Sequence, residues 1–299
     1  METPVVASRL FQGDNLAVMD RLIAEGVAVD LIVTDPPFFT GKEQRREGVA
    51  YSDAWETLDD YLAWLRATIE RSHALLAPTG SLFLHLDWHA SHHARVILDE
   101  VFGAARFRNE IVWCYTGPGS PAMGQFNRKH DTILWYSRGS EWTFHRDAVR
   151  VAHHPKTRAN FRGDLEGSGF ANEGYELDDD GKVPEDWWTF AIAARFPVDG
   201  VTRVGYPTEK PVALVERIVL AASSEGDLVA DLLCGGGTVP FVAARHGRRW
   251  IAGDVSPDAV EMTRRRLEAM GERVEMITSL TPQPPLPKWE RGSRISASI

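Results

Sequence analysis

The chain has 299 residues and ordinary apolar and aromatic content, enough for one large α/β domain or two smaller ones. It contains no apolar run of 18 residues and no signal peptide, so we expect a cytoplasmic protein with no membrane partner. A net charge of −9 argues against a protein that coats nucleic acid indiscriminately, although it allows a local basic groove.

The first predicted elements are a short strand that runs into a turn over 9–15 and a helix over 16–24 that stops at Gly26. Asp14 stands between them, at the end of the strand. It is either the N-cap of the helix or part of a site at the sheet edge, and both interpretations stay open.

The next strand ends abruptly in Asp35-Pro36-Pro37-Phe38. Two prolines cannot continue a strand ladder, so Asp35 is expected at the carboxyl end of a buried strand, where α/β sheets bind ligands. The carboxylate can accept one hydrogen of a planar amino group, the Pro36 carbonyl can accept the other, and Phe38 offers a face for base stacking. The alternative is a strand-end turn with a capping aspartate.

The polar segment 39–55 is expected to be either a lid beside that site or a solvated connection. A helix over 58–76, a buried strand over 81–87 and a helix over 89–101 follow. Histidines cluster here, but no cysteine or carboxylate completes a ligand set, so we predict no metal site. The cysteines, Cys114 and Cys234, form neither a disulfide framework nor a zinc pattern.

Strands over 109–115 and 131–136 flank a Gly/Pro-rich loop and predict an antiparallel hairpin at the sheet edge. From 128 to 162, eight Lys and Arg stand against three acids, whereas 164–180 holds seven acids and no Lys or Arg. The basic segment, with its interleaved aromatic residues, either follows a phosphate backbone or is a solvated face. The candidate DNA contacts are Arg128, Lys129, Arg146, Arg150, Lys156, Arg158 and Arg162.

The second strong signal is a buried strand that runs into Gly235-Gly236-Gly237 and a helix over 239–246. The following strand ends at Asp254, about 18 residues later, close to the spacing at which an acid binds ribose hydroxyls. Contiguous glycines do not fit the dinucleotide fingerprint and favour a nucleoside without a pyrophosphate. A purely structural turn is the alternative. Lys210, at the start of a helix over 211–222, is a cation where the helix dipole favours an anion, which suggests an anionic partner.

Together these motifs resemble the beta class of DNA amino-methyltransferases, over most of 10–267 and more weakly over 141–204. In this resemblance the catalytic tetrad is Asp35, Pro36, Pro37 and Phe38, and it precedes the glycine motif, as the beta order requires. The cofactor-binding residues implied are Asp14, Asn15, Leu16, Asp35, Thr208, Lys210, Asp231, Leu233, Cys234, Gly235, Gly237, Thr238, Asp254 and Val255. Leu232-Leu233 replaces the usual Pro-Phe, so we expect an aromatic contact to the cofactor to be lost.

The resemblance implies a doubly wound, Rossmann-like α/β sheet, mostly parallel with an antiparallel edge hairpin, in a circularly permuted motif order. It implies a catalytic half over 8–140, a small target-recognition insertion over 141–204 and a cofactor-binding half over 205–272. The proline-rich tail over 280–299 is expected to be disordered. S-adenosylmethionine is the implied cofactor and double-stranded DNA the implied partner. The family also admits a homodimer and a cognate restriction enzyme.

The implied reaction is methylation of the N6 amine of an adenine flipped out of duplex DNA. Asp at the head of the tetrad favours adenine. The alternatives are cytosine-N4 methylation, an RNA or protein-amide methyltransferase, and an inactive cofactor-binding module. Cytosine-C5 chemistry is rejected, because Cys114 and Cys234 do not stand where that reaction needs its nucleophile.

Overall fold

The computed structural model describes residues 8–41, 43–46, 49–53, 55–117, 124–160, 177–192, 206 and 209–280, which build one nine-stranded sheet. Across the sheet the strands are β11 (Glu275–Leu280), β1 (Arg9–Gly13), β10 (Arg249–Asp254), β9 (Leu228–Asp231), β2 (Val29–Thr34), β5 (Leu76–Leu86), β7 (His130–Ser137), β6 (Phe107–Cys114) and β8 (Trp187–Thr189). Only β7 runs antiparallel to its neighbours; the other pairs are parallel. This confirms the predicted mostly parallel α/β sheet.

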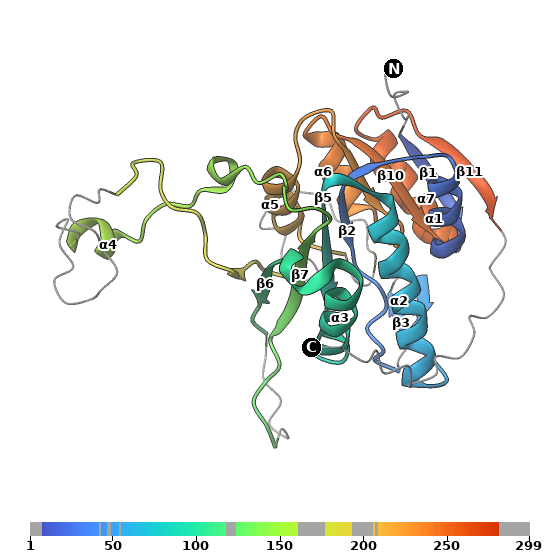
Figure 1. Cartoon of the computed structure of the whole chain (residues 1–299), viewed down its shortest axis with the longest axis horizontal. Coiled ribbons are helices and arrows are strands. Elements are labelled where there is room, and N and C mark those ends of the chain that lie inside the picture. The colour runs from blue at the N-terminus through green and yellow to red at the C-terminus, as the bar shows by residue number, and fades with distance from the viewer. Residues whose placement is uncertain are drawn as a thin grey trace, which may run out of the picture.

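Helices cover both faces of this sheet (Figure 1). One face is packed by α1 (Asn15–Ala24), α2 (Leu58–Leu75) and α3 (Ser91–Leu98), the other by α5 (Val212–Ala222), α6 (Thr238–Arg245) and α7 (Pro257–Glu268). Side chains of β2 point alternately to the two faces of the sheet. Ile32 packs in the hydrophobic cluster under α1, α2 and α3, while Leu31 and Val33 pack in the cluster under α5, α6 and α7.

The helices begin where the sequence supplies caps. Asp14 accepts a hydrogen bond from the Ala17 amide at 3.0 Å and starts α1. Thr57 starts α2 in the same way, and Ser256 starts α7 with a proline directly after it. Each cap satisfies one of the amides that a helix N-terminus leaves without an internal partner.

The chain leaves the centre of the sheet in two directions. From β9 it passes through α6 to β10 on one side, and from β2 it passes through α2 to β5 on the other. Because β2 and β9 are hydrogen-bonded neighbours, the crossovers diverge between them. A parallel sheet opens a crevice at such a switch point, at the carboxyl ends of its strands.

Several elements differ from the expectations. The 39–55 segment contains an antiparallel pair, β3 (Glu43–Arg46) and β4 (Val49–Ser52). The β6–β7 hairpin is confirmed, but it is not the edge, since the short β8 pairs with β6 outside it. β5 begins at Leu76, five residues earlier than expected, because Val29 of β2 pairs there. β11 was not predicted, and the tail beyond 280 lies outside the described residues.

Part of 141–204 projects from the body of the molecule, and α4 (Pro155–Asn160) lies far from the sheet (Figure 1). The rest belongs to the body, since the turn over 146–149 packs against α5 and β8 pairs with β6. A backbone bridge between Val151 and Lys182 joins the outgoing and returning segments. Arg150 reinforces this junction through ion pairs with Asp147 and Asp178, each at 2.7 Å. Among the described helices, none combines the length and the apolar composition that a membrane crossing requires.

Candidate functional site: three strand-end acids around one cavity

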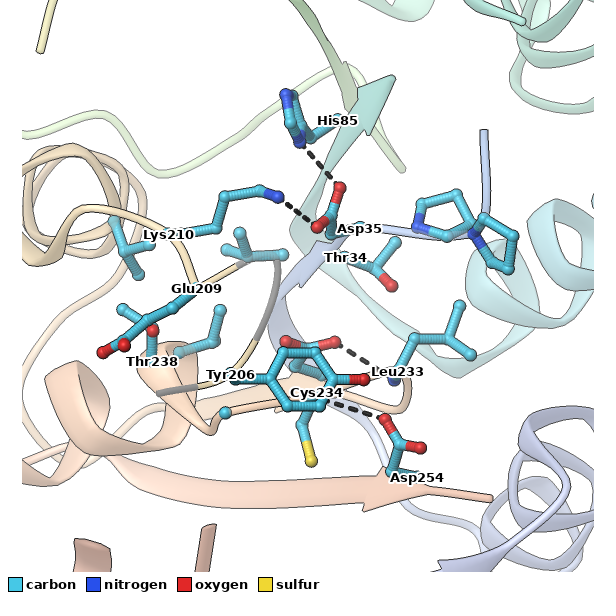
Figure 2. Close-up of a pocket in the computed structure, with 18 of the residues that line it drawn as sticks. Thr34, Asp35, His85, Tyr206, Glu209, Lys210, Leu233, Cys234, Thr238 and Asp254 are labelled. Atoms are coloured by element: carbon cyan, nitrogen blue, oxygen red, sulfur yellow. Dashed lines mark hydrogen bonds and ion pairs between the residues drawn. The ribbon is translucent and has the colours of Figure 1, made fainter. Parts of the chain in front are cut away.

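Three carboxylates converge at the carboxyl ends of three adjacent strands. Asp35 directly follows β2, Asp231 is the last residue of β9, and Asp254 is the last residue of β10. They line a cavity of about 580 Å³. Figure 2 shows Asp35 at its upper end, Asp254 at its lower end and the Tyr206 ring between them. The sequence pointed to Asp35 and Asp254 as acids at strand ends, and to Asp231 through the resemblance of the glycine motif.

Asp35 lies between two cationic groups. Its Oδ1 is 2.7 Å from Nδ1 of His85, and its Oδ2 accepts a hydrogen bond from the Lys210 ammonium (Figure 2). Burial would raise the pKa of Asp35, but the charges of Lys210 and His85 outweigh burial and lower the pKa below its usual value. The carboxylate is therefore held as an anion with a fixed orientation.

The residues after Asp35 are also held in place. The Pro37 carbonyl accepts the Tyr61 hydroxyl at 2.8 Å, and Phe38 meets the His85 ring edge-on at 5.2 Å. Phe39 has a φ of 63°, which is unfavourable for a residue with a β-carbon. Asp53, which is only 1% exposed, supports this turn, because its carboxylate accepts a hydrogen bond from the Phe39 amide at 2.8 Å.

The glycine turn is shaped around Asp254 and Tyr206. The Gly235 amide donates to one Asp254 oxygen and the Ser256 amide to the other, both at 2.9 Å. Burial raises the pKa of Asp254. Gly235 has a φ of 48°, and a β-carbon there would lie 2.6 Å from the Tyr206 ring. Only glycine therefore lets this backbone approach the aromatic ring.

A buried ion pair fixes the segment that carries Lys210. Glu209 lies 3.1 Å from Arg266 of α7, and both side chains are only 4% exposed. Arg266 also donates to the Gly236 carbonyl at 2.9 Å. The glycine turn, α7 and the approach to α5 thus share one charged contact, which positions Lys210 beside Asp35.

Most of the predicted cofactor residues line the cavity. These are Asp35, Lys210, Asp231, Leu233, Cys234, Gly235, Thr238, Asp254 and Val255, together with the tetrad residues Pro36, Pro37 and Phe38. Leu233 replaces the aromatic residue usual in the family, and Tyr206 presents an aromatic ring to the same cavity. Gly237 packs beneath the turn, where a β-carbon would meet Thr263 at 2.6 Å.

Three predicted cofactor residues lie apart from this cavity lining. Asp14 caps α1, Asn15 donates to the Thr68 hydroxyl at 3.1 Å, and Leu16 is buried. They remain near the site, because Gln12 of β1 pairs with Asp254 of β10. Thr208 lies outside the described residues.

The predicted DNA contacts fall into three groups. Arg128 stacks on Trp88, with its guanidinium carbon 3.8 Å from the ring centroid, and Lys129 follows it and is partly buried. Lys156 is exposed on the projecting segment and Arg146 on the turn that packs against α5, whereas Arg150 is committed to Asp147 and Asp178. The Arg158 side chain and all of Arg162 lie outside the described part.

Sequence reasoning missed the residues that support the acids, namely His85, Asp53, Tyr61, Tyr206 and Arg266. His85 was considered only as a metal ligand. One signal was present, since His85 is the one polar residue among the apolar residues 82–86. In the described ranges, no group of three or more His, Cys, Asp or Glu could hold a metal ion.

Solved structures of DNA methyltransferases share this fold. PvuII DNA methyltransferase, titled as cytosine-N4-specific, matches with a TM-score of 0.60 and 17% identity over 88% of this chain and 86% of its own. The M1.HpyAVI–SAM complex matches with a TM-score of 0.56 and 19% identity over 87% and 98%. At these identities the likeness concerns the fold, which is the Rossmann-like methyltransferase fold.

Sequence comparisons identify the family within that fold. The family model described as "DNA methylase", for N6 and N4 enzymes, matches residues 29–265. The DNA adenine methyltransferase YhdJ of Escherichia coli (strain K12) is 30% identical over 88% of this chain and 83% of its own. This chain belongs to the N6/N4 DNA methylase family.

Proposed function

We propose that this DNA methylase transfers a methyl group from S-adenosylmethionine to the N6 amine of adenine in double-stranded DNA. The observation that carries the proposal is the single cavity shared by Asp35 and Asp254. One end offers a rigid carboxylate for an amine, and the other offers a buried carboxylate and a glycine turn for a nucleoside.

The cavity residues fit this methyl donor. Asp254 is held by two backbone amides and can accept ribose hydroxyls, while Gly235 admits the ligand close to the backbone. Asp231 is a buried acid suited to a cationic amino group. When bound, S-adenosylmethionine supplies a methyl group on a positively charged sulfur.

The tetrad can prepare an exocyclic amine for attack. Asp35 accepts one amine hydrogen and the Pro36 carbonyl the other, since the Pro37 carbonyl is already bonded to Tyr61. Such acceptors favour a pyramidal nitrogen with an available lone pair, and Phe38 stacks on the base. The bound donor would supply the methyl group to this nitrogen and would leave as a neutral thioether. The methylated nitrogen would then lose one proton, which Asp35 can accept.

Two further observations bear on the target. Asp at the head of the tetrad favours adenine in the family, and the relative YhdJ is named as an adenine enzyme. The second candidate is cytosine N4, because the family model includes such enzymes and PvuII methyltransferase shares the fold. The projecting region around α4 supports the assignment of 141–204 to target recognition. A homodimer and a restriction enzyme partner stay predictions.

The test is nucleoside analysis of modified DNA. Unmethylated duplex DNA is incubated with the protein and S-adenosylmethionine bearing a deuterated methyl group, digested and analysed by mass spectrometry. We expect deuterated N6-methyladenine and no labelled N4-methylcytosine. If only labelled N4-methylcytosine is found, the target is cytosine N4 and not adenine N6. If label is found only in an RNA control, DNA is not the substrate.

A further inference from the structure

His85 reaches Asp35 because of the register between β2 and β5. Thr34 pairs with Leu84, so the next residue on each strand stands side by side at the sheet edge. Burial leaves His85 5% exposed, and its Nδ1 lies 2.7 Å from Asp35 Oδ1. The imidazole is thus a buried titratable group in direct contact with the proposed amine acceptor.

The other side of the imidazole faces a second acid. His85 pairs with Ile133 of β7, and Asp131 lies two residues before Ile133, on the same side of that strand. The Asp131 carboxylate is 3.4 Å from His85 Nε2 and accepts the Tyr115 hydroxyl at 3.1 Å. Two carboxylates therefore lie at the two nitrogens of one ring.

Aromatic rings close off the remaining sides of His85. The Phe38 centroid lies 5.2 Å from the imidazole centroid, and the Trp113 centroid lies 5.6 Å away. These apolar neighbours limit access of water to the ring. A charge on the imidazole must then be balanced by the protein groups around it.

The charges balance when His85 carries two protons. The groups that face it are the carboxylates Asp35 and Asp131 and the ammonium of Lys210, with the Tyr115 hydroxyl behind Asp131. A neutral imidazole would leave one negative charge in excess. Burial and Lys210 lower the pKa of His85, but the two carboxylates outweigh them and raise the pKa above its usual value.

We propose that His85 is a positioning residue which, as an imidazolium balanced by Asp131, fixes the Asp35 carboxylate for methyl transfer and thereby sets the basic limit of activity. The imidazolium binds Asp35 Oδ1 and holds the plane of the carboxylate. Because each carboxylate oxygen has two acceptor positions, Asp35 can still accept a hydrogen of the target amine. This inference rests on the proposed function, since the amine is its substrate.

The sign of the pH dependence follows from the proton count. Below the raised pKa, His85 is an imidazolium and holds Asp35. Above it, His85 loses the proton on Nε2, the nitrogen that faces Asp131. The site then carries a net negative charge, and the Asp35 carboxylate is held less firmly. We therefore expect the single-turnover methylation rate to fall as the pH rises through the His85 pKa.

Two substitutions distinguish the roles of the two ring nitrogens of His85. His85→Asn keeps an N–H donor near the Nδ1 position, toward Asp35, whereas His85→Gln places its donor near the Nε2 position, toward Asp131. We expect His85→Gln to lower the single-turnover rate by about 10- to 100-fold, the effect of one charge-assisted hydrogen bond. His85→Asn keeps a neutral donor toward Asp35 but not the charge, so its rate should match that of the wild type above the basic limit, exceed that of His85→Gln and no longer change at basic pH, because asparagine does not titrate.

Controls distinguish a positioning role of His85 from a role in the stability of the fold. Cofactor affinity and thermal unfolding should be close to wild type for both variants. His89→Asn is the matched control, because His89 forms a similar 2.7 Å contact with Asp87 and does not line the cavity. It should leave the rate and the pH profile unchanged. Asp131→Asn should move the basic limit to lower pH.

The outcome can contradict the inference without touching the proposed function. If His85→Gln methylates DNA at the wild-type rate, or if both His85 variants lose activity equally while keeping the wild-type pH profile, His85 does not position Asp35. If the wild-type protein methylates no DNA, the proposed function itself fails.

Discussion

At the scale of single residues, the three strand-end acids have different electrostatic environments. Asp35 is held as an anion by Lys210 and His85, whereas Asp231 and Asp254 are buried among backbone groups and one another. Such divergent pKa values within one cavity are typical of sites where similar groups have separate roles. Here one acid suits the amine and the other two suit the methyl donor.

The protonation of Asp231 makes cofactor binding depend on pH. Burial, followed by the charges of Asp35 and Asp254, raises the pKa of Asp231 to about 8. Without a cationic ligand, we therefore expect Asp231 to be mostly protonated at neutral pH. A cationic ligand favours the carboxylate, so binding should release a proton, and affinity should rise with pH until about pH 8 and then level off.

Isothermal titration calorimetry in two buffers of different ionisation enthalpy measures this proton. We expect net release near pH 7 and little release near pH 9. Asp231→Asn should abolish the released proton and weaken binding. Equal apparent enthalpies in both buffers at pH 7 would contradict a protonated Asp231.

Gly235 tests the shape of the turn. Gly235→Ala places a β-carbon 2.6 Å from the Tyr206 ring and keeps a left-handed backbone. Gly26→Ala is the matched control, because Gly26 also has a positive φ but has nothing within 4 Å of the new atom. Each should lower stability by about 1–2 kcal/mol from backbone strain.

Only Gly235→Ala should also weaken cofactor binding, because Tyr206 must move. Chemical unfolding and cofactor titration of both variants provide the comparison. An equal loss of cofactor affinity in the two variants would show that the contact between Gly235 and Tyr206 does not shape the cavity.

At the scale of elements, the buried pair of Glu209 and Arg266 connects α7 with the segment before α5. Arg266→Met should destabilise the fold by about 3–5 kcal/mol, because it leaves Glu209 buried without that counter-charge. Arg264→Met on the same helix removes only partly exposed ion pairs and should cost much less stability. Urea unfolding measures both, and similar losses would contradict the importance of burial.

Much of the fold could be predicted, since apolar runs end at prolines, glycines and caps. α1, α5, β2 and β9 follow the sequence closely for this reason. β8 could not be predicted, because its three residues, Trp187 to Thr189, form a strand only by pairing with β6. The β3–β4 pair could not be predicted either, because β3 consists of polar residues and the segment shows no alternation of apolar and polar residues.

The candidate site likewise has residues that could be predicted from the sequence and residues that could not. Asp35 and Asp254 could be predicted because each stands at the end of a buried strand, and parallel order brings strand ends together, whereas Asp231 was implied by the resemblance of the glycine motif. His85 and Arg266 reach the site through register and helix packing, which the sequence does not encode locally. Asp14 was ambiguous for a related reason, as capping and ligand binding use the same residue types.

At the scale of the whole molecule, a chain with a net charge of −9 must bind DNA through local basic surfaces. Lys156 is exposed on the projecting segment and Arg146 on the turn before it, whereas Arg150 forms ion pairs with Asp147 and Asp178. Replacing Arg146 and Lys156 with glutamate should weaken DNA binding at constant cofactor affinity. The loss of two phosphate contacts should reduce the salt slope by about 1.8.

Fluorescence anisotropy of labelled duplex DNA over a salt series measures this slope. Arg265→Glu on α7, where the side chain is 74% exposed, is a control for charge alone. A salt slope that falls equally in the control would mean that the projecting segment is not the DNA-binding surface.

The most direct test of the account is Asp35→Ala, assayed for cofactor binding by calorimetry and for methyl transfer to duplex DNA by nucleoside mass spectrometry. The account predicts that the variant still binds S-adenosylmethionine, because Asp254 and the glycine turn remain, while methyl transfer disappears. A variant that still methylates DNA at the wild-type rate would contradict the assignment of Asp35 as the group that holds the amine.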